Sequence, residues 1–389
     1  MFLDLTIRKN PRLIDTAFLL HQEGHIEPDT YVLDLDAIIY NGMAIKEEAD
    51  KYGIRLYFMT KQFGRNPYVA AELMKIGYEG AVAVDYREAL ILHQNGIPLG
   101  HVGHLVQIPT RLVETIVKMR PEVITVYSIE KAREVDAAAK KTGITQKILM
   151  KVIDHGDVIF PGQYGGFYFS TLENSVKELL KLSNLELDGL TSFPCFTVDK
   201  DKKVICETNN LNTLLRAKIF IEEKFNIKMN QMNTPSVTCT SNIKKIAELG
   251  GTSGEPGHGL SGTTPIHALA DQVELPVSVY VSEVSHNLDS QSYCYGGGYY
   301  RRSFMKEAIV GKEVTTARRI GTEVPNDSTI DYYIGLRENT LVGDTAIFAF
   351  RTQIFTTRSE VAVVKGISTG EPQVVGIYDS QGKLVRSGV

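Results

Sequence analysis

The chain contains 389 residues, of which 43% are hydrophobic and 23% are charged, and its formal net charge is −4. This length suffices for one large domain and a smaller one, because a single hydrophobic core stops growing near roughly 250–300 residues. The slightly acidic balance excludes the basic surface that nucleic acid or an anionic membrane requires, so we expect a small-molecule partner and neither of these.

The cysteines give no sign of a metal or redox site. Cys195, Cys206, Cys239 and Cys294 are scattered, and none has the C-x-x-C spacing of a zinc ribbon or a dithiol pair. We therefore expect these four cysteines to be reduced thiols. The first residues place several charges among short apolar runs, which predicts neither a signal peptide nor a transmembrane span. We therefore expect a cytoplasmic protein.

The chain begins with a helical pattern and continues as alternating strands and helices. Residues 1–30 contain Asn10-Pro11 and then an amphipathic run that ends near Gly24, which predicts a lead-in helix. From Tyr31 onward, apolar β-rich runs alternate with longer helical patterns. After an opening segment, strands are predicted at 55–60, 80–84, 100–106, 123–127, 147–153, 187–192, 236–240 and 250–257. Helices are predicted at 67–76, 86–95, 109–120, 129–143, 171–183, 207–226, 241–249 and 263–271.

This alternation predicts the fold class α/β, with a (β/α)8 barrel over residues 31–270, because eight β/α units match the usual extent of about 250 residues. A doubly wound open sheet is the alternative, but it more often carries a glycine-rich turn after its first strand, where this chain has Lys61. Beyond Ala270 the pattern changes to short alternating strands, which predicts a smaller antiparallel β domain over residues 271–389.

Lys61 stands at the carboxyl end of the first predicted barrel strand, in the run IRLYFMTKQFGRN. An ordinary lysine at this place extends its ammonium into solvent at the rim of the sheet. Alternatively, partial desolvation keeps the amine neutral, and a neutral amine can form a Schiff base with a carbonyl compound. The stretch alone leaves both interpretations open.

Two segments near the predicted barrel mouth could bind an anion. Ser241 and Asn242 open a helix after the seventh predicted strand, which suits a phosphate, although an ordinary N-cap is the alternative. The segment GGTSGEPGHGLSG follows, where glycines such as Gly257 let the backbone approach a ligand closely, although a flexible loop is the alternative. Within it, Glu255 is either solvated or keeps a heteroaromatic ring nitrogen protonated, and His258 has no clustered metal-ligand partners, so a polar or surface role competes with ligand binding.

The segment CYGGGYYRR, residues 294–302, combines three glycines with two arginines. It suits a loop that projects Tyr295 into a neighbouring site, and a plain turn between strands is the alternative.

Together these segments resemble the fold-type III pyridoxal-phosphate enzymes, the alanine racemase superfamily, and most closely its YhfX-like branch. The likeness extends from about residue 31 to residue 302. LDLDAIIYN is similar to the family's V-D-L-D-A-I-x-x-N, and MTKQFGRNP stands where the family has V-V-K-A-N-x-Y-G, which implies that Lys61 is the Schiff-base lysine. LMKVIDHG resembles x-K-V-D-T-G and implies that Lys151 supports the site, while CTSN places Ser241 at the phosphate-binding serine.

CYGGGYYRR resembles the family's G-Y-x-D-G-x-x-R, which implies that Tyr295 is the second catalytic base and reaches the active site of the partner subunit in a homodimer. The departures are informative too. Glu255 replaces the arginine that racemases place against the pyridine nitrogen, and it looks more like the E-P-G-R of ornithine and diaminopimelate decarboxylases. Gly297 replaces the motif's aspartate, the tyrosine after the lysine is missing, and the strand-six histidine is replaced around Ser192-Phe193.

The resemblance implies a pyridoxal-phosphate-dependent amino-acid racemase, an isomerase that moves the Cα proton of an amino-acid substrate between Lys61 and Tyr295. The alternatives are an amino-acid decarboxylase of the same fold type and a cofactor-binding protein with little activity. The implied cofactor ligands are Lys61, Lys151, Ser241, Asn242, Glu255, Gly257 and His258.

Overall fold

The computed structural model describes residues 1–326 and 328–388. The chain divides into two compact units by its contacts. The barrel unit comprises Ala44–Thr60 and Ala70–Gly257. The β unit comprises Met1–Met43, Lys61–Val69 and His258–Val389.

The barrel unit is built on parallel strands that close on themselves, as the alternating pattern predicted. In the nine-stranded sheet each strand of the barrel pairs with the next, and β5 also pairs with β6, which closes the ring; β7 (Phe167–Tyr168) extends beyond the ring, pairing with β6 alone among the described residues. The barrel strands are β2 (Arg55–Phe58), β3 (Gly80–Ala83), β4 (Leu99–Val102), β5 (Val123–Val126), β6 (Gln146–Ile153), β8 (Leu185–Thr191), β11 (Gln231–Asn233) and β12 (Ser253–Gly254).

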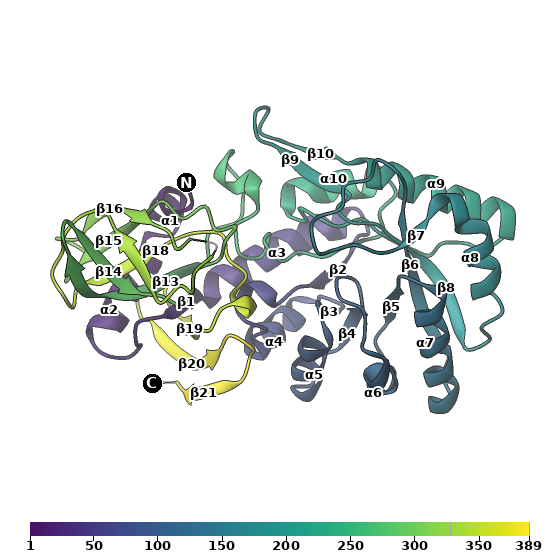
Figure 1. The fold of residues 1–389 in the computed structure, drawn as a ribbon, viewed down its shortest axis with the longest axis horizontal. Coiled ribbons are helices and arrows are strands. Elements are labelled where there is room, and N and C mark those ends of the chain that lie inside the picture. The colour runs from purple at the N-terminus through teal and green to yellow at the C-terminus, as the bar shows by residue number, and fades with distance from the viewer. Residues whose placement is uncertain (327, 389) are drawn as a thin grey trace. The chain divides into compact units, whose positions relative to one another are not determined.

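Helices follow seven of the barrel strands near the predicted positions, and Figure 1 shows α5, α6 and α7 along the outer side of their neighbouring strands. The predicted helix at 263–271 was wrong, because the described residues there form only the short 3₁₀ helix η4 (Pro265–Ala268). Local capping explains where they start and stop: the Ser128 side chain accepts a hydrogen bond from the Lys131 N–H at the start of α7, and Gly143 ends that helix in the left-handed conformation. The helices are α3 (Leu35–Lys51), α4 (Pro67–Ile76), α5 (Tyr86–Gln94), α6 (Val113–Lys118), α7 (Ile129–Thr142), α8 (Leu172–Leu179), α9 (Asn209–Phe225) and α10 (Thr240–Glu248).

The prediction of the seventh strand at 236–240 was wrong, because β11 lies at Gln231–Asn233 and residues 236–239 form the loop that leads into α10. The register explains the position: Gln231 pairs with Gly189 of β8. A Cβ on Gly189 would lie 1.8 Å from the Gln231 carbonyl oxygen, so the two strands approach closely only because residue 189 has no side chain. The hairpin of β9 (Phe196–Asp199) and β10 (Val204–Glu207) was not predicted.

The β unit contains a ten-stranded sheet in the order β14-β17-β16-β15-β18-β13-β1-β19-β20-β21. The opening segment contributes β1 to this sheet, antiparallel to β13 and parallel to β19. The domain limits stay a prediction, but the contacts group β1 with the C-terminal strands. The strands are β1 (Thr30–Asp34), β13 (Ser278–Leu288), β14 (Gln291–Tyr295), β15 (Glu307–Gly311), β16 (Arg318–Glu323), β17 (Tyr333–Leu336), β18 (Thr345–Phe348), β19 (Glu360–Lys365), β20 (Gln373–Asp379) and β21 (Leu384–Ser387).

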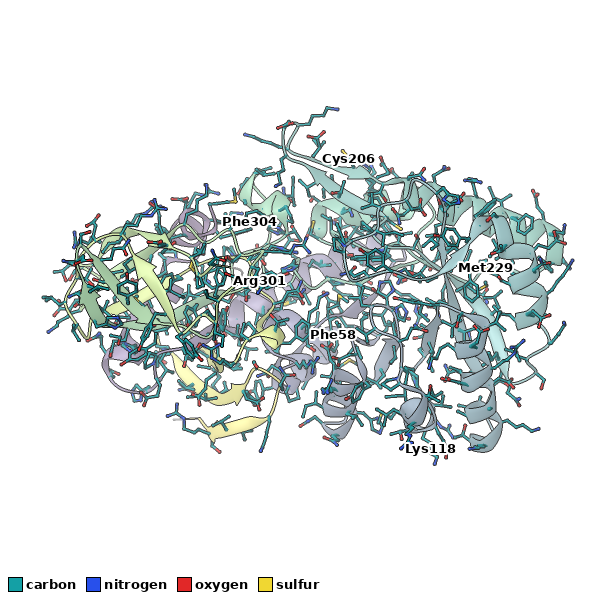
Figure 2. All side chains as sticks on the ribbon, viewed as in Figure 1. Phe58, Lys118, Cys206, Met229, Arg301 and Phe304 are labelled. Atoms are coloured by element: carbon teal, nitrogen blue, oxygen red, sulfur yellow. The ribbon has the colours of Figure 1, made fainter. Side chains whose placement is uncertain are left out.

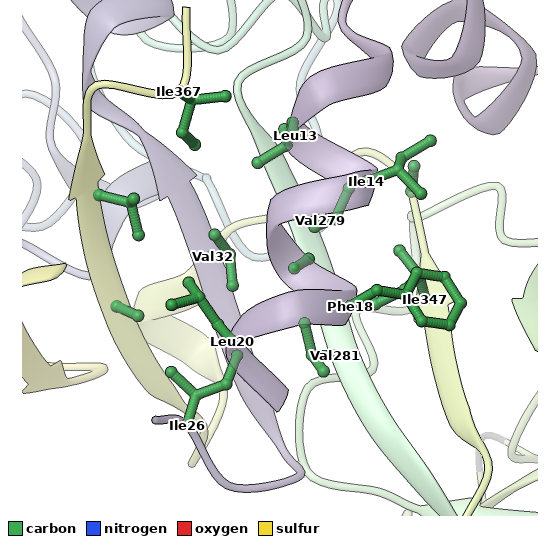
Figure 3. Packing of buried hydrophobic residues seen from close by; sticks show 14 of the residues in the cluster. Leu13, Ile14, Phe18, Leu20, Ile26, Val32, Val279, Val281, Ile347 and Ile367 are labelled. Atoms are coloured by element: carbon green, nitrogen blue, oxygen red, sulfur yellow. The ribbon is translucent and has the colours of Figure 1, made fainter. Parts of the chain in front are cut away.

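The lead-in segment forms two helices, α1 (Phe2–Lys9) and α2 (Pro11–Gln22), which meet at Asn10. The Asn10 side chain donates hydrogen bonds to Asp34 Oδ2 at 2.8 Å and to the Pro276 carbonyl at 3.0 Å, which joins the two helices to the sheet. The apolar face of α2 packs on the sheet in a buried cluster (Figure 3). Its members include Leu13, Phe18, Val32, Val279 and Ile347.

No helix within residues 1–326 and 328–388 has the length and apolar character that crossing a membrane requires.

Candidate active site

Glu255 is the central charged group of the barrel interior. It directly follows β12 and is only 7% exposed. His101 on β4 contacts it with Nδ1 2.6 Å from Glu255 Oε1, and Asn233 on β11 donates to the same oxygen at 3.0 Å. Burial opposes ionisation, but the imidazoles of His104 and His101 and the hydrogen bonds hold the pKa of the Glu255 carboxyl below its ordinary value. The group is therefore a carboxylate at neutral pH.

The second oxygen of Glu255 is open to a donor. Oε2 is buried and accepts no hydrogen bond from the described residues, and His104 Nε2 lies 3.8 Å away. A buried acceptor without a donor is costly, so such an oxygen usually faces a ligand or water. A protonated pyridine nitrogen offers one N–H donor, and this oxygen fits it.

Sequence reasoning missed His101 and His104. His101 spans the barrel from β4, with Nε2 hydrogen-bonded to the Thr125 hydroxyl of β5, and its ring lies 5.0 Å from the ring of His104. The rings of Phe193 and His104 form a T-shaped pair with their centroids 5.8 Å apart. The signal was present in GHVGH at 100–104, where two histidines interrupt an apolar strand pattern.

Lys151 lies on β6 and is 3% exposed. Its Nζ donates to the Gln163 carbonyl at 3.3 Å and lies 4.4 Å from the centre of the Tyr127 ring. Burial lowers the pKa of Lys151 to about 8, because the charged amine is disfavoured away from water. A fraction of the amine is thus neutral near physiological pH.

The predicted phosphate segment begins at α10. Ser241 is exposed in the first turn, with its hydroxyl 3.4 Å from Cys239 Sγ, and the helix has no side-chain cap. Asn242 is buried and donates from Nδ2 to the Val237 carbonyl at 3.1 Å, so it holds the loop in front of the helix. The Glu255 N–H donates to Thr238 Oγ1 at 3.4 Å. This bond joins the Glu255 turn to the loop that precedes Ser241.

Gly257 is buried at the end of that turn and is the last residue of the barrel unit along the chain. The neighbouring Pro256 carbonyl accepts a hydrogen bond from the Met59 N–H at 3.0 Å, which fixes the turn against the end of β2.

Lys61 and His258 both belong to the β unit. Lys61 opens the short 3₁₀ helix η1 (Lys61–Phe63), three residues after Phe58, which is fully buried at the end of β2 (Figure 2). His258 Nδ1 lies 3.1 Å from Thr263 Oγ1. Burial, followed by the positive charges of Arg351, Lys61 and Arg302, holds the pKa of His258 well below its ordinary value.

Tyr295 ends β14 with a side chain that is 39% exposed. The Ser282 hydroxyl donates to its carbonyl at 2.7 Å, and the ring lies 6.2 Å from the ring of Tyr333. The three glycines that follow let the loop pack closely. A Cβ on Gly296 would lie 2.0 Å from the Asp331 carbonyl oxygen, and one on Gly298 would lie 2.3 Å from the Tyr280 ring.

Asp331 supplies the carboxylate that the tyrosine loop itself lacks. Its Oδ2 accepts from the backbone N–H groups of Gly297 at 3.2 Å and Tyr299 at 3.4 Å, while Oδ1 pairs with Arg358 at 2.7 Å. Arg358 also donates to the Asp331 carbonyl at 2.9 Å. Asp331 and Arg358 therefore fix the backbone behind Tyr295, whereas Arg301 is exposed (Figure 2).

In residues 1–326 and 328–388, no group of three or more His, Cys, Asp or Glu side chains is arranged to hold a metal ion. The barrel unit contains Lys151, Ser241, Asn242, Glu255 and Gly257 of the predicted site, and the β unit contains Lys61, His258 and Tyr295. Their catalytic and binding roles stay predictions.

A closed parallel barrel followed by an antiparallel β domain is the fold of the alanine racemase class. A family model described as "Alanine racemase, N-terminal domain" matches residues 33–265, more than half of the chain, and one described as "YhfX-like, C-terminal domain" matches residues 279–374. The chain belongs to this family, which confirms the resemblance.

The chain is 45% identical over 383 residues to "Uncharacterized protein YhfX" from Escherichia coli (strain K12), covering 98% of this chain and 99% of the relative. The D-threonine aldolase from Filomicrobium marinum superposes with a TM-score of 0.70 at 15% identity, covering 91% of this chain and 94% of that one. The alanine racemase of Clostridium difficile 630 in complex with cycloserine gives 0.65 at 18% identity, covering 90% and 98%. These two structures confirm the predicted fold class.

Proposed function

We propose that the chain is a pyridoxal-phosphate-dependent enzyme that racemises an amino acid. The observation that carries the cofactor is the buried carboxylate of Glu255, whose Oε2 lacks a donor among the described residues and suits a protonated ring nitrogen. Racemisation is proposed because the segment of residues 294–302 resembles the family motif that implies Tyr295 as a second base. Membership in a family that typically binds this cofactor supports the same conclusion. The bound cofactor would supply an electron sink that acidifies the Cα–H bond of the substrate.

The chain's own residues would divide the remaining work. The Lys61 amine would attach the cofactor, Glu255 would hold its ring nitrogen protonated, and Lys151 would support the site from β6. Ser241, Asn242, Gly257 and His258 would surround its phosphate. His101 and Asn233 keep Glu255 oriented through their hydrogen bonds to Oε1.

Racemisation needs two proton-transfer groups on opposite faces of Cα, and Lys61 and Tyr295 of the partner subunit are the candidates. Tyr295 would donate a proton to Cα for one enantiomer and accept one for the other, and a cationic neighbour would favour the second step. The bonds from Asp331 to the loop support this role because they fix the backbone that follows Tyr295. The proposal includes a homodimer in which each subunit completes the site of the other.

A decarboxylase is the second candidate, because a carboxylate at position 255 resembles the decarboxylases of this fold type more than the racemases. A protein that binds the cofactor with little turnover is the third. Release of carbon dioxide from an amino acid would favour the decarboxylase, and bound cofactor without turnover of any L- or D-amino acid would favour the third candidate.

The attachment of the cofactor is tested by the absorbance of the purified protein after incubation with pyridoxal phosphate. We expect a visible band that is removed by sodium borohydride and is absent from Lys61→Ala. The matched control is Lys75→Ala, which removes an exposed lysine paired with Glu72 at 2.7 Å and should keep the band. A band that persists in Lys61→Ala would overturn the assignment.

The second base is tested by Tyr295→Phe in deuterated water across a panel of L- and D-amino acids. We expect kcat for inversion to fall at least about 100-fold while the cofactor band stays, since a positioned acid or base contributes about 10²–10⁴-fold. Tyr333→Phe, which alters the neighbouring exposed tyrosine 6.2 Å away, is the control and should keep most activity. Unchanged Cα–H exchange and inversion in Tyr295→Phe would show that another group is the second base.

A further inference from the structure

The Tyr280 hydroxyl lies between two acceptors, next to the loop that carries Tyr295. Tyr280 is on β13, and its side chain is fully buried. Its hydroxyl oxygen is 3.0 Å from Asp29 Oδ1 and 3.3 Å from the carbonyl oxygen of Tyr295. The ring fits closely against the loop, because a Cβ added to Gly298 would lie 2.3 Å from it. A buried side chain thus links Asp29 to the backbone of Tyr295.

A tyrosine hydroxyl has one hydrogen, so it can serve only one of these acceptors at full strength. An ionised carboxylate is the stronger acceptor, because hydrogen bonds to a charged group are roughly twice as strong as neutral ones. When Asp29 is ionised, the hydrogen of Tyr280 therefore goes to Asp29. The Tyr295 carbonyl then keeps the hydrogen bond from the Ser282 hydroxyl at 2.7 Å.

Protonation of Asp29 reverses this preference. The neutral carboxyl group is a weaker acceptor, and its own O–H can donate to the Tyr280 hydroxyl oxygen. The hydrogen of Tyr280 is then available to the Tyr295 carbonyl, which gains a second donor beside Ser282. One proton on Asp29 thus decides how many donors hold the backbone of Tyr295.

The surroundings of Asp29 bring its titration close to physiological pH. Burial raises the pKa of Asp29 to about 6, the two hydroxyls that donate to it and Arg358 oppose the shift, and the charge of Asp331 adds to it. Arg358 is itself paired with Asp331 at 2.7 Å. The neighbouring hydroxyls of Tyr31 and Tyr280 do not ionise in this range, because burial holds the pKa of each far above its ordinary value.

We propose that Tyr280 is a positioning residue for Tyr295 and that Asp29 controls it, since the protonated carboxyl group directs the Tyr280 hydrogen to the Tyr295 carbonyl and the carboxylate withdraws it. The inference rests on the proposed function, because the position of Tyr295 matters to the reaction only if its phenol is the second base. Small displacements of a reacting group reduce the rate steeply. The contribution of Tyr280 to kcat should therefore be larger on the acidic side of the Asp29 titration.

The hydrogen bond is tested on the cofactor-free protein through the ¹³C resonance of the Tyr295 carbonyl, which shifts when the carbonyl gains a donor. Labelling tyrosine carbonyl carbons with ¹³C and glycine nitrogens with ¹⁵N selects the Tyr–Gly pairs, which begin at Tyr52, Tyr164 and Tyr295. The signal that is missing from Tyr295→Phe identifies position 295, and the Tyr52 signal is the internal reference.

We expect the Tyr295 carbonyl signal of the wild type to move with pH, with a midpoint near the Asp29 pKa of about 6. It should stay constant in Asp29→Asn, which cannot titrate, and in Tyr280→Phe, which has no hydrogen to transfer. Ser282→Ala is the matched control, because it removes the other donor to the same carbonyl and should keep the movement.

The positioning role is tested by the ratio of kcat for inversion between the wild type and Tyr280→Phe at each pH, since titrations common to both proteins cancel in this ratio. We expect a ratio of about two- to tenfold at pH 5, as one hydrogen bond allows, that falls towards one at pH 8 while KM stays similar. Tyr378→Phe, at a buried tyrosine of β20, is the control and should give a ratio near one throughout.

The outcomes separate the inference from the proposed function. A Tyr295 carbonyl signal that stays constant with pH in the wild type, or that moves equally in Tyr280→Phe, overturns the inference. A kcat ratio that is the same at pH 5 and pH 8 overturns it as well, because a merely structural tyrosine acts equally at both. A moving carbonyl signal in a protein that inverts no amino acid supports the exchange of hydrogen bonds and overturns the proposed function instead.

Discussion

Gly297 shows how the absence of one side chain shapes the loop of Tyr295. Its backbone has φ +132°, a conformation that suits glycine, and an added Cβ would lie 1.9 Å from Asp29 Oδ2. The alanine racemase motif has an aspartate at this place, but here Asp29 fills the space below the loop and Asp331 makes the bonds to its backbone. The carboxylate that bonds to the loop backbone therefore comes from another segment of the chain, and position 297 itself has no side chain.

Gly297→Ala should therefore destabilise the protein by more than a backbone penalty alone. We expect a loss of about 2–4 kcal/mol in the free energy of unfolding, from unfavourable φ and from displacement of Asp29. Gly343→Ala is the matched control, because φ is +86° there and nothing lies within 4 Å of the added Cβ, so we expect about 1 kcal/mol. Urea unfolding of both variants measures the difference, and equal losses would contradict the account. Gly297→Asp should lose more than Gly297→Ala, since it adds a carboxylate between Asp29 and Asp331.

At the scale of elements, the sequence predicted most strands and helices of the barrel because hydrophobic periodicity is a local property. The seventh strand was misplaced because β11 is a three-residue strand whose position depends on the absent side chain of Gly189, which lies far away in the chain. The hairpin of β9 and β10 has intermediate or exposed positions at most of its residues, so it has no strong apolar alternation to detect.

Residues of the candidate site could be predicted only where the residue type or the local composition is itself unusual. Lys61 and Glu255 stand out as charges at strand ends, and the glycines of 296–298 stand out by composition. His101 did not, because its partner Glu255 is 154 residues away and the two meet only when the barrel closes. Asp331 was missed for the same reason, since its bonds to the tyrosine loop span more than thirty residues.

At the scale of the whole molecule, Asp29 ties together segments from both ends of the chain. It precedes β1, and its carboxylate accepts hydrogen bonds from the hydroxyls of Tyr280, at 3.0 Å, and Ser359, which are 251 and 330 residues away. Burial raises the pKa of Asp29 to about 6, although the hydroxyls and Arg358 oppose the shift. The folded state therefore binds the Asp29 proton more tightly than the unfolded state does.

The sign of the pH dependence follows from this difference. Between the unfolded value of about 3.9 and the folded value of about 6, the folded protein binds more protons, so the contribution of Asp29 to stability falls as pH rises through this window. The loss is complete by pH 7 and is of the order of 2–3 kcal/mol.

Asp29→Asn does not titrate, so its free energy of unfolding relative to the wild type should rise by about that amount between pH 4 and pH 7. Asp271→Asn is the control, because Asp271 is exposed and its pKa is lowered by Lys9, so its relative stability should not rise over this range. Urea unfolding at a series of pH values measures both differences, and a constant offset between Asp29→Asn and the wild type would show that the carboxylate is ionised equally in both states.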